Sequence, residues 1–182
     1  NFFLVAIELW QIDDSPLAPK FKVISRPNEW KRSIRASAQD DELTDTKTKQ
    51  LDFWQQLKDF AYIKNPELNL RSPRPQHWYD VSIGRSDCHI SLTVLSRDGK
   101  VGCELYIPGS KELFRQFLSN KEQIEKELAL PEPLEWMELP AKKASRIRAV
   151  YPCEFSDQKT WAAVFGWLID TAVKFKRVFA QN

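Results

Sequence analysis

Apolar side chains recur at intervals of three and four residues along three stretches of the chain, which is typical of amphipathic helices. The first predicted helix covers Thr46–Ile63. The second begins after Ser110, a favourable N-cap, and runs to about residue 128, where prolines stop it. The third is capped near Ser156 or Asp157. Its apolar stripe is formed by Trp161, Phe165, Leu168, Ala172, Phe175 and Phe179.

Shorter apolar runs between these helices predict β-strands. They are expected at Trp78–Ile83, His89–Ser96, Lys100–Ile107, Leu134–Leu139 and Ser145–Tyr151. Asp98-Gly99 favours a tight hairpin, so the second and third of these strands should be antiparallel neighbours. The order α-β-β-β-α-β-β-α indicates an α+β fold, in which helices pack on an antiparallel sheet of about five strands.

A short β-containing extension precedes this unit. Strands are expected at residues 2–10 and 21–25. From Ala36 to Thr48 the chain is small and polar, and it has little apolar surface to bury. We therefore expect three parts: residues 1–35 as a β-containing extension, which the resemblance described below assigns to the tail of an upstream domain, 36–48 as a polar linker, and 49–182 as the α+β domain.

The composition favours a soluble, cytoplasmic protein. Apolar residues make up 42% of the chain and charged ones 29%, which argues against global disorder. The longest apolar run, Trp161–Val173, falls short of the roughly 20 residues that a bilayer requires, so no membrane contact is expected. Three widely spaced cysteines argue against a disulfide framework. The first residues lack an initiator Met and a signal sequence, which indicates a piece of a longer chain.

Residues suited to catalysis are sparse. The chain has two histidines, His77 and His89, that could act as bases, but it contains no Gly-x-Ser-x-Gly motif to provide a nucleophilic Ser. It also lacks the glycine-rich motifs that bind phosphate. Cys88 and His89 are adjacent and should point to opposite faces of a strand, so they do not form a pair of metal ligands. We expect no catalytic residue, no metal ligand and no cofactor in this chain.

Metal-dependent nuclease chemistry needs carboxylates and often a Lys two residues after one of them. The strand that should carry this pattern reads Glu104-Leu105-Tyr106, with an aromatic residue in place of the Lys. An enzyme that used Asp80 and Glu104 as acids would need a pocket that holds both carboxyls. The sequence leaves open whether these two residues share a face of the sheet.

The end of the chain is its basic region. Residues 140–182 hold eight basic and three acidic side chains, whereas residues 110–139 hold four and seven. Arg146 and Arg148 alternate with apolar residues, so one face of their strand should present two guanidinium groups. With Lys142 and Lys143 just before them, these four residues are our candidate nucleic-acid-binding residues, as contacts to phosphates. The alternative is a solvated face that Glu135 and Glu138 partly neutralise.

Two stretches resemble known families. Phe3–Leu9, Asp14-Ser15-Pro16, Ala18–Phe21 and Pro27–Trp30 are similar to the tail of a PD-(D/E)XK nuclease-like domain of prokaryotic proteins. The remainder resembles the domain that follows it there, the domain of unknown function 4268. Its marks are Glu104–Ile107, Lys111 with Phe114, Lys121-Glu122 with Ile124-Glu125, Leu134–Trp136, Leu139-Pro140 with Lys142-Lys143, Ser145–Ile147, and Trp161 with Trp167.

The resemblance implies that a nuclease site, with its acidic residues, its Lys and Mg²⁺, would lie upstream of Asn1. We therefore expect a non-catalytic C-terminal accessory module of a prokaryotic nuclease-like protein, which assists DNA binding. Its partners would be the upstream nuclease-like domain of the same chain and DNA. The alternative is a protein-interaction or homodimerisation module that uses the terminal helix and contacts no nucleic acid.

Overall fold

The computed structural model describes residues 4–10, 18–25, 44–65, 68 and 70–180. The chain divides into two compact units, residues 1–49 and 50–182. In the first unit β1 (Leu4–Trp10) pairs with β2 (Ala18–Ser25) as an antiparallel hairpin, which confirms both predicted strands. The linker predicted at 36–48 lies outside the described residues up to residue 43, and α2 begins at Asp45.

The second unit is built on a five-stranded sheet in which every neighbouring pair of strands is antiparallel. In spatial order the strands are β3 (Trp78–Val81), β4 (His89–Leu95), β5 (Lys100–Ile107), β7 (Ser145–Pro152) and β6 (Glu135–Met137). The α+β class and the antiparallel sheet are confirmed. The last two strands, β6 and β7, form an antiparallel hairpin. Its second strand, β7, pairs with β5, so β6 lies at the edge of the sheet.

Four helices are described in this part of the chain: α2 (Asp45–Lys64), α3 (Lys111–Ser119), α4 (Lys121–Leu128) and α5 (Trp161–Phe179). The single helix expected after Ser110 is thus two helices, which meet at Asn120. The Ser110 N-cap is confirmed, because its Oγ accepts a hydrogen bond from the Leu113 N–H at 3.1 Å. Asn favours local backbone contacts over a continuous helix, and the Asn120 N–H donates to the carbonyls of Phe117 and Leu118.

Two short 3₁₀ turns complete the unit. The turn η1 (Ser96–Asp98) connects β4 to β5, and Gly99 follows it with φ +60°. The predicted antiparallel pair is confirmed, but its connection has four residues, since Leu95 pairs with Lys100. The turn η2 (Gln158–Thr160) precedes α5, and Asp157 caps this turn rather than the helix itself.

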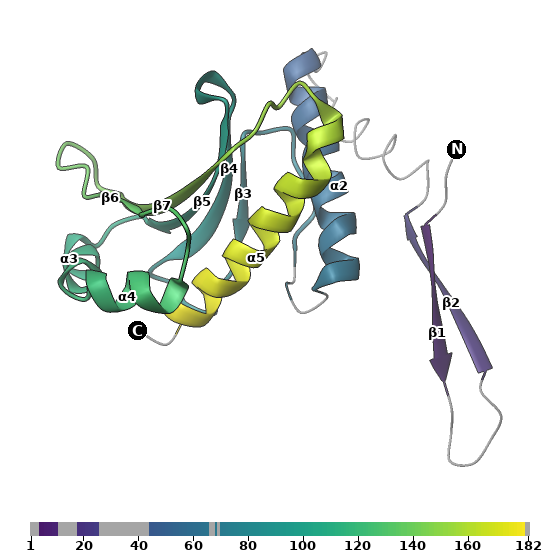
Figure 1. Cartoon of the computed structure of the whole chain (residues 1–182), viewed down its shortest axis with the longest axis horizontal. Coiled ribbons are helices and arrows are strands. Elements are labelled where there is room, and N and C mark those ends of the chain that lie inside the picture. Colours follow the sequence, from purple (N-terminus) through teal and green to yellow (C-terminus); the bar gives the residue numbers. More distant parts are fainter. Residues whose placement is uncertain (1–3, 11–17, 26–43, 66–67, 69, 181–182) are drawn as a thin grey trace. The chain divides into compact units, whose positions relative to one another are not determined.

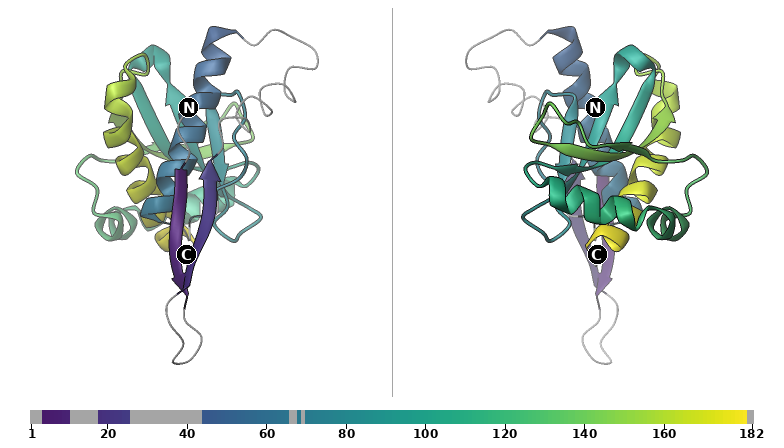
Figure 2. Two further views of the ribbon diagram at one scale, coloured as in Figure 1. Left: turned by 90° about the vertical axis from the view of Figure 1, so that its right-hand side faces the viewer. Right: turned by 90° about the vertical axis from the view of Figure 1, so that its left-hand side faces the viewer.

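The helices lie on one face of the sheet (Figures 1 and 2). Tyr79, Leu92, Cys103 and Ala149 pair across four strands, are all buried, and form a row on this face. The Tyr79 ring stacks on Trp54 of α2 at 5.4 Å between centroids. The apolar surface predicted for the terminal helix is buried here too, with Val164 1% exposed and Trp167 stacked on Tyr151. None of the described helices is long and apolar enough to span a bilayer.

Phe53 of α2 lies at the centre of this core. Its side chain is fully buried and meets four other rings nearly edge-on, at centroid distances of 4.9 to 5.4 Å. These rings belong to Trp54, Phe155, Trp161 and Phe165. Edge-to-face packing of this kind adds to the free energy of apolar burial. Phe53 therefore couples α2 to the start of α5.

We expect Phe53→Ala to lower the free energy of unfolding by about 3–5 kcal/mol, because it leaves a cavity between α2 and α5. Urea denaturation followed by circular dichroism measures this change. Leu118→Ala is the control, since Leu118 is 40% exposed on α3 and should cost well under half as much. Equal losses for the two variants would show that the aromatic cluster is not the centre of stability.

Candidate functional site

The face of the sheet away from the helices carries polar side chains in register across five strands. Asp80 of β3 pairs with Ser91 of β4, and Ser91 pairs with Glu104 of β5. Glu104 pairs with Arg148 of β7, which in turn pairs with Glu135 of β6. Residues directly opposite in an antiparallel sheet point to the same face. Asp80 and Glu104 therefore share a face, which the sequence alone left open.

A cavity of about 380 Å³ opens on this polar face. It is lined by His77, Trp78, Asp80, His89, Ser91, Thr93, Glu104, Tyr106 and Arg146. We call it the sheet pocket. A neighbouring hollow of about 290 Å³ shares Trp78 and Asp80 with the sheet pocket and is also lined by Arg71 and Arg74. The polar face is thus continuous, at the edge strand β3, with a basic surface formed by Arg71 and Arg74.

Glu104 forms the floor of the sheet pocket. It is 2% exposed, and its Oε1 lies 3.5 Å from Nη1 of Arg146. Among the described residues, Oε2 of Glu104 and Nε of Arg146 are the buried side-chain polar atoms without a hydrogen-bond partner. The Arg146 guanidinium also lies 5.4 Å from the centre of the Tyr106 ring. The floor therefore holds an unused acceptor and an unused donor near one another.

The two carboxyls of the pocket lie in different environments. Asp80 accepts a hydrogen bond from Ser91 Oγ at 2.9 Å, and its Oδ1 lies 3.5 Å from His89 Nε2. The contact with His89, together with that of Ser91, lowers the pKa of Asp80. Burial raises the pKa of Glu104, although Arg146 and Arg148 act in the opposite direction. The site thus drives the pKa values of its two acids apart.

The Arg148 side chain extends along the sheet surface next to Gly102 of β5. Its Nη2 lies 2.6 Å from Oε2 of Glu135, and its Nε donates to the same oxygen at 2.8 Å. A Cβ on Gly102 would lie 2.6 Å from Thr93 Oγ1 and 3.2 Å from Arg148 Cδ. Glycine at this point of β5 therefore leaves room for the Thr93 hydroxyl and for the stem of the Arg148 side chain.

The predicted candidate residues separate into two pairs. Arg146 and Arg148 share one face of β7, as the alternation predicted, but each lies beside a carboxylate. Lys142 and Lys143 are exposed in the β6–β7 connection, and neither side chain has an ion pair within the described residues. Whether these four residues bind phosphate stays a prediction.

Glu135 and Glu138 were expected to neutralise part of the charge of the arginines on β7, and this expectation is right for Glu135 alone, which pairs with Arg148. Glu138 instead pairs with Arg115 of α3 at 2.8 Å. The partner that sequence reasoning missed is Glu104, which lies 44 positions before Arg148 and meets it only because β5 and β7 are neighbours. A charged residue amid the apolar run of β5 was the signal that could have found it.

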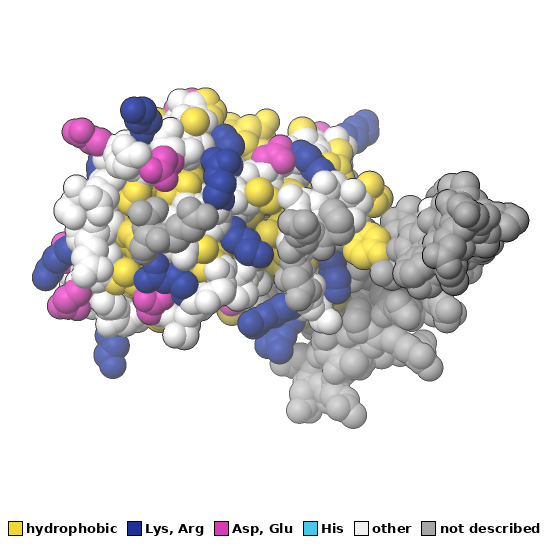
Figure 3. Space-filling model, turned by 90° about the horizontal axis from the view of Figure 1, so that it is seen from below, with side chains coloured by type: hydrophobic (Ala, Val, Ile, Leu, Met, Phe, Trp, Pro, Cys, Tyr) yellow, Lys and Arg dark blue, Asp and Glu magenta, His cyan; other side chains and the backbone are white. Residues whose placement is uncertain are grey.

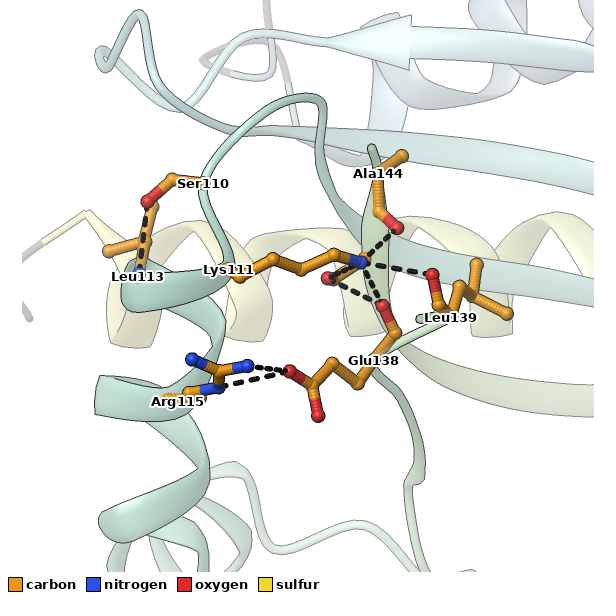
Figure 4. A network of polar contacts seen from close by, with 8 residues as sticks. Ser110, Lys111, Leu113, Arg115, Glu138, Leu139 and Ala144 are labelled. Carbon is orange, nitrogen blue, oxygen red and sulfur yellow. Dashed lines mark hydrogen bonds and ion pairs between the residues drawn. The ribbon is translucent and has the colours of Figure 1, made fainter. Parts of the chain in front are cut away.

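Lys111 fixes the shape of the β6–β7 connection (Figure 4). Its Nζ donates to the carbonyls of Glu138, Leu139 and Ala144 and to Oγ of Ser145. Leu139 has φ +53°, a left-handed conformation that is costly for a residue other than glycine. The Leu139 carbonyl also accepts from the Lys142 N–H at 2.8 Å, and the Glu138 carbonyl from Ser145 Oγ at 2.9 Å. The ammonium adds a shared donor that ties these carbonyls to α3, together with the loop that carries Lys142 and Lys143.

Other chemistry is less well supported by the described residues. They contain no group of three His, Cys, Asp or Glu side chains placed to hold a metal ion. Cys88, Cys103 and Cys153 are buried thiols, and burial raises the pKa of Cys88 to about 11, so this thiol is unreactive at neutral pH. On the face seen in Figure 3, Lys and Arg side chains are interspersed with acidic and apolar ones. The polar sheet face is the candidate site.

The fold and the site define an α+β domain that presents an open polar sheet face with a pocket in it. The chain belongs to the Domain of unknown function (DUF4268) family, whose model matches residues 49–182. The comparisons with curated proteins and with solved structures give no match. The nuclease-like tail predicted before this domain lies outside the matched residues and stays a prediction.

Several marks of the family resemblance meet in one place. Lys111, Leu139 and Ser145 all belong to the network of Figure 4, and Lys142 and Lys143 lie in the loop that it holds. Ser145 is the first residue of β7, and the next residue of this strand, Arg146, lines the sheet pocket. The resemblance therefore rests in part on residues that shape the basic loop and the floor of the pocket.

We expect Lys111→Met to lower the free energy of unfolding by about 1–3 kcal/mol, since it removes a charged donor that bonds to three carbonyls and one hydroxyl of the β6–β7 connection. Urea denaturation measures the loss. Lys126→Met is the matched control, because Lys126 is exposed on α4 and should change the stability by less than about 0.5 kcal/mol. A loss no larger than that of the control would exclude a structural role for the network.

The raised pKa of Glu104 makes a prediction about pH. Because the folded chain holds the proton of Glu104 more tightly than the unfolded chain does, this group favours folding most at acidic pH. Its contribution falls as the pH rises from its ordinary pKa of 4.5 through the raised value. We expect Glu104→Gln to gain stability relative to the parent chain as the pH rises from 4.5 through the raised pKa of Glu104.

Asp80→Asn should show the opposite trend, which serves as the comparison. The pKa of Asp80 is lowered in the folded chain, so the stability it contributes is present above its ordinary pKa of 3.8 and is lost in more acidic solution. Chemical denaturation at a series of pH values follows both variants. If the stability difference between Glu104→Gln and the parent were independent of pH, the raised pKa would be contradicted.

Proposed function

We propose that this domain is a non-catalytic module that binds nucleic acid and assists a nuclease-like protein in engaging DNA. The observation that carries the proposal is the β6–β7 connection. It holds Lys142 and Lys143 exposed, without a carboxylate partner among the described residues, at the end of the strand that bears Arg146 and Arg148. Exposed cations on a fixed loop suit contacts with phosphates.

The four candidate residues have different roles in this proposal. Lys142 and Lys143 contact phosphates directly as point charges. Nη2 of Arg148 lies 2.6 Å from Oε2 of Glu135, and Arg146 lies over the floor of the sheet pocket. In this proposal the two guanidinium groups are held by carboxylates and do not contact phosphates as free charges. A fully compensated Arg contributes less to the long-range attraction of a polyanion than an uncompensated Lys does.

A second basic surface supports the proposal. Arg71 and Arg74 are exposed and line the hollow that adjoins the sheet pocket, together with Trp78, which is 40% exposed. Proteins that bind single-stranded nucleic acid combine cationic side chains along the backbone with exposed aromatic rings on which bases stack. This pairing was not part of the prediction from sequence, because Trp78 was expected only as the first residue of a strand.

The proposed partner is a nuclease-like domain on the same polypeptide, before the residues of this chain. The support is the resemblance of residues 3–30 to the tail of such a domain. In this proposal Mg²⁺ and the cleavage chemistry belong to that upstream domain, and the domain at 49–182 supplies affinity. The protein would then act in the cytoplasm, where its DNA lies.

The alternative is a protein-interaction or homodimerisation module. The sequence favoured the terminal helix for this role, but α5 packs its apolar residues into its own domain, and its exposed residues are Ala162, Ala163, Asp170 and Arg177. An interaction module would therefore have to use another surface. It also predicts that the basic loop has no effect on DNA binding.

We expect Lys142→Ala combined with Lys143→Ala to weaken binding to labelled DNA in fluorescence anisotropy. The dependence of log affinity on log salt should become shallower by about 0.7 for each phosphate of a single strand that is no longer neutralised, or about 0.9 for a duplex. The control combines Lys126→Ala with Lys159→Ala, which removes two exposed charges outside this loop. Arg146 and Arg148 are left intact, because their removal would leave Glu104 and Glu135 without cations.

The proposal fails if the double variant and the control bind with the same affinity and the same salt dependence. It also fails if the parent chain binds neither single-stranded nor duplex DNA at low salt. Circular dichroism and thermal unfolding of both variants confirm that the comparison concerns folded protein.

A further inference from the structure

The sheet pocket adds a feature that phosphate binding does not use. We infer that it receives one unpaired nucleobase that carries an amino group, while the backbone of the strand stays on the basic residues around it. This inference rests on the proposed function, because the phosphate contacts bring the strand to the sheet. It assigns the pocket a role in selecting the base rather than in holding the backbone.

The first argument is the unused hydrogen-bonding capacity of the floor. Oε2 of Glu104 and Nε of Arg146 are buried and lack partners among the described residues, which is unusual for polar atoms inside a protein. The contact between the two residues is 3.5 Å long, whereas charge-assisted hydrogen bonds are about 2.7–2.9 Å. Arg146 is 34% exposed, so its guanidinium can turn as a ligand enters. The pair then offers an acceptor and a donor to one edge of a ligand.

The second argument is the shape and nature of the walls. Trp78, His89 and Tyr106 place aromatic rings around the opening, with His89 and Tyr106 at 5.3 Å between centroids. Trp78 is 40% exposed, so its ring is accessible to a ligand. Aromatic rings of this kind stack on planar heterocycles. The volume of about 380 Å³ lies in the range of ligand clefts, about 300–1,000 Å³.

The third argument is the distribution of charge. Asp80 and Glu104 both line the sheet pocket, so a phosphate group inside it would meet two carboxyls. Arg71 and Arg74 instead lie in the adjoining hollow, which shares Trp78 with the pocket. A nucleotide fits this arrangement with its uncharged base in the pocket and its phosphate outside, on the other side of Trp78.

The floor also predicts which bases are accepted. Cytosine presents an amino donor next to a ring acceptor, which matches Glu104 and Arg146, and carboxylates commonly accept from the cytosine amino group. Thymine has no amino group, and its single ring N–H lies between two carbonyls that would face the Glu104 carboxylate. The pocket should therefore prefer cytosine to thymine, a preference that phosphate contacts alone do not produce.

The test compares binding of oligo(dC) and oligo(dT) of one length to the 182-residue chain at one salt concentration. We expect the parent chain to bind oligo(dC) roughly tenfold more tightly. Glu104→Gln should remove this preference by raising the affinity for oligo(dT), because the neutral amide can donate to a thymine carbonyl. Trp78→Ala should weaken both by about tenfold, and Trp78→Phe should restore most of the loss. Because Trp78 is partly exposed, its replacement leaves the core intact, and circular dichroism checks each variant.

Equal binding of the two oligonucleotides by the parent chain overturns the inference, as does a preference that survives Glu104→Gln. Both results leave the proposed function standing, since it rests on the effect of Lys142 and Lys143. If no oligonucleotide binds, the proposed function fails, and deoxycytidine and thymidine monophosphates then probe the pocket directly by calorimetry. Selective binding of the cytosine nucleotide supports a base site, and equal or absent binding of the two overturns it.

Discussion

A carboxylate buried on the central strand of a sheet must be compensated, and the polar face of this domain is arranged around that requirement. Glu104 is 2% exposed and pairs across β5 and β7 with Arg148, while Arg146 lies over it. Gly102 provides the space that the Arg148 side chain needs. Such clusters seldom add stability over apolar residues of similar size, and this one leaves Oε2 of Glu104 and Nε of Arg146 without partners among the described residues.

Local patterns predicted the elements, and long-range pairing decided the site. The helices at α2 and α5 and the arginine face of β7 follow from periodicity, which depends only on nearby residues. The convergence of Asp80 and Glu104 depends on strand order, which periodicity does not specify. The split at Asn120 was missed because apolar residues continue at helical spacing on both sides of it. The Lys111 network joins residues more than 25 positions apart and has no local signature.

In the proposed function, the polar face separates two tasks of nucleic-acid binding. Exposed lysines on a loop attract any phosphate backbone, and their contribution does not depend on the base sequence. Hydrogen-bonding groups held by a sheet are more rigid and suit discrimination between bases. The domain holds these groups on different elements, the β6–β7 connection and the strands β5 and β7, so under the proposal affinity and selectivity would vary independently of each other.

The outer strands of the sheet are short: β3 has four residues and β6 has three. Each offers few free backbone groups to an added strand, and short outer strands are one way in which proteins prevent sheets from joining side by side. A partner that extends the sheet would therefore gain little from backbone hydrogen bonding. Aggregation through the sheet margins is therefore disfavoured, and the proposed recognition would use side chains on the broad surface of the sheet.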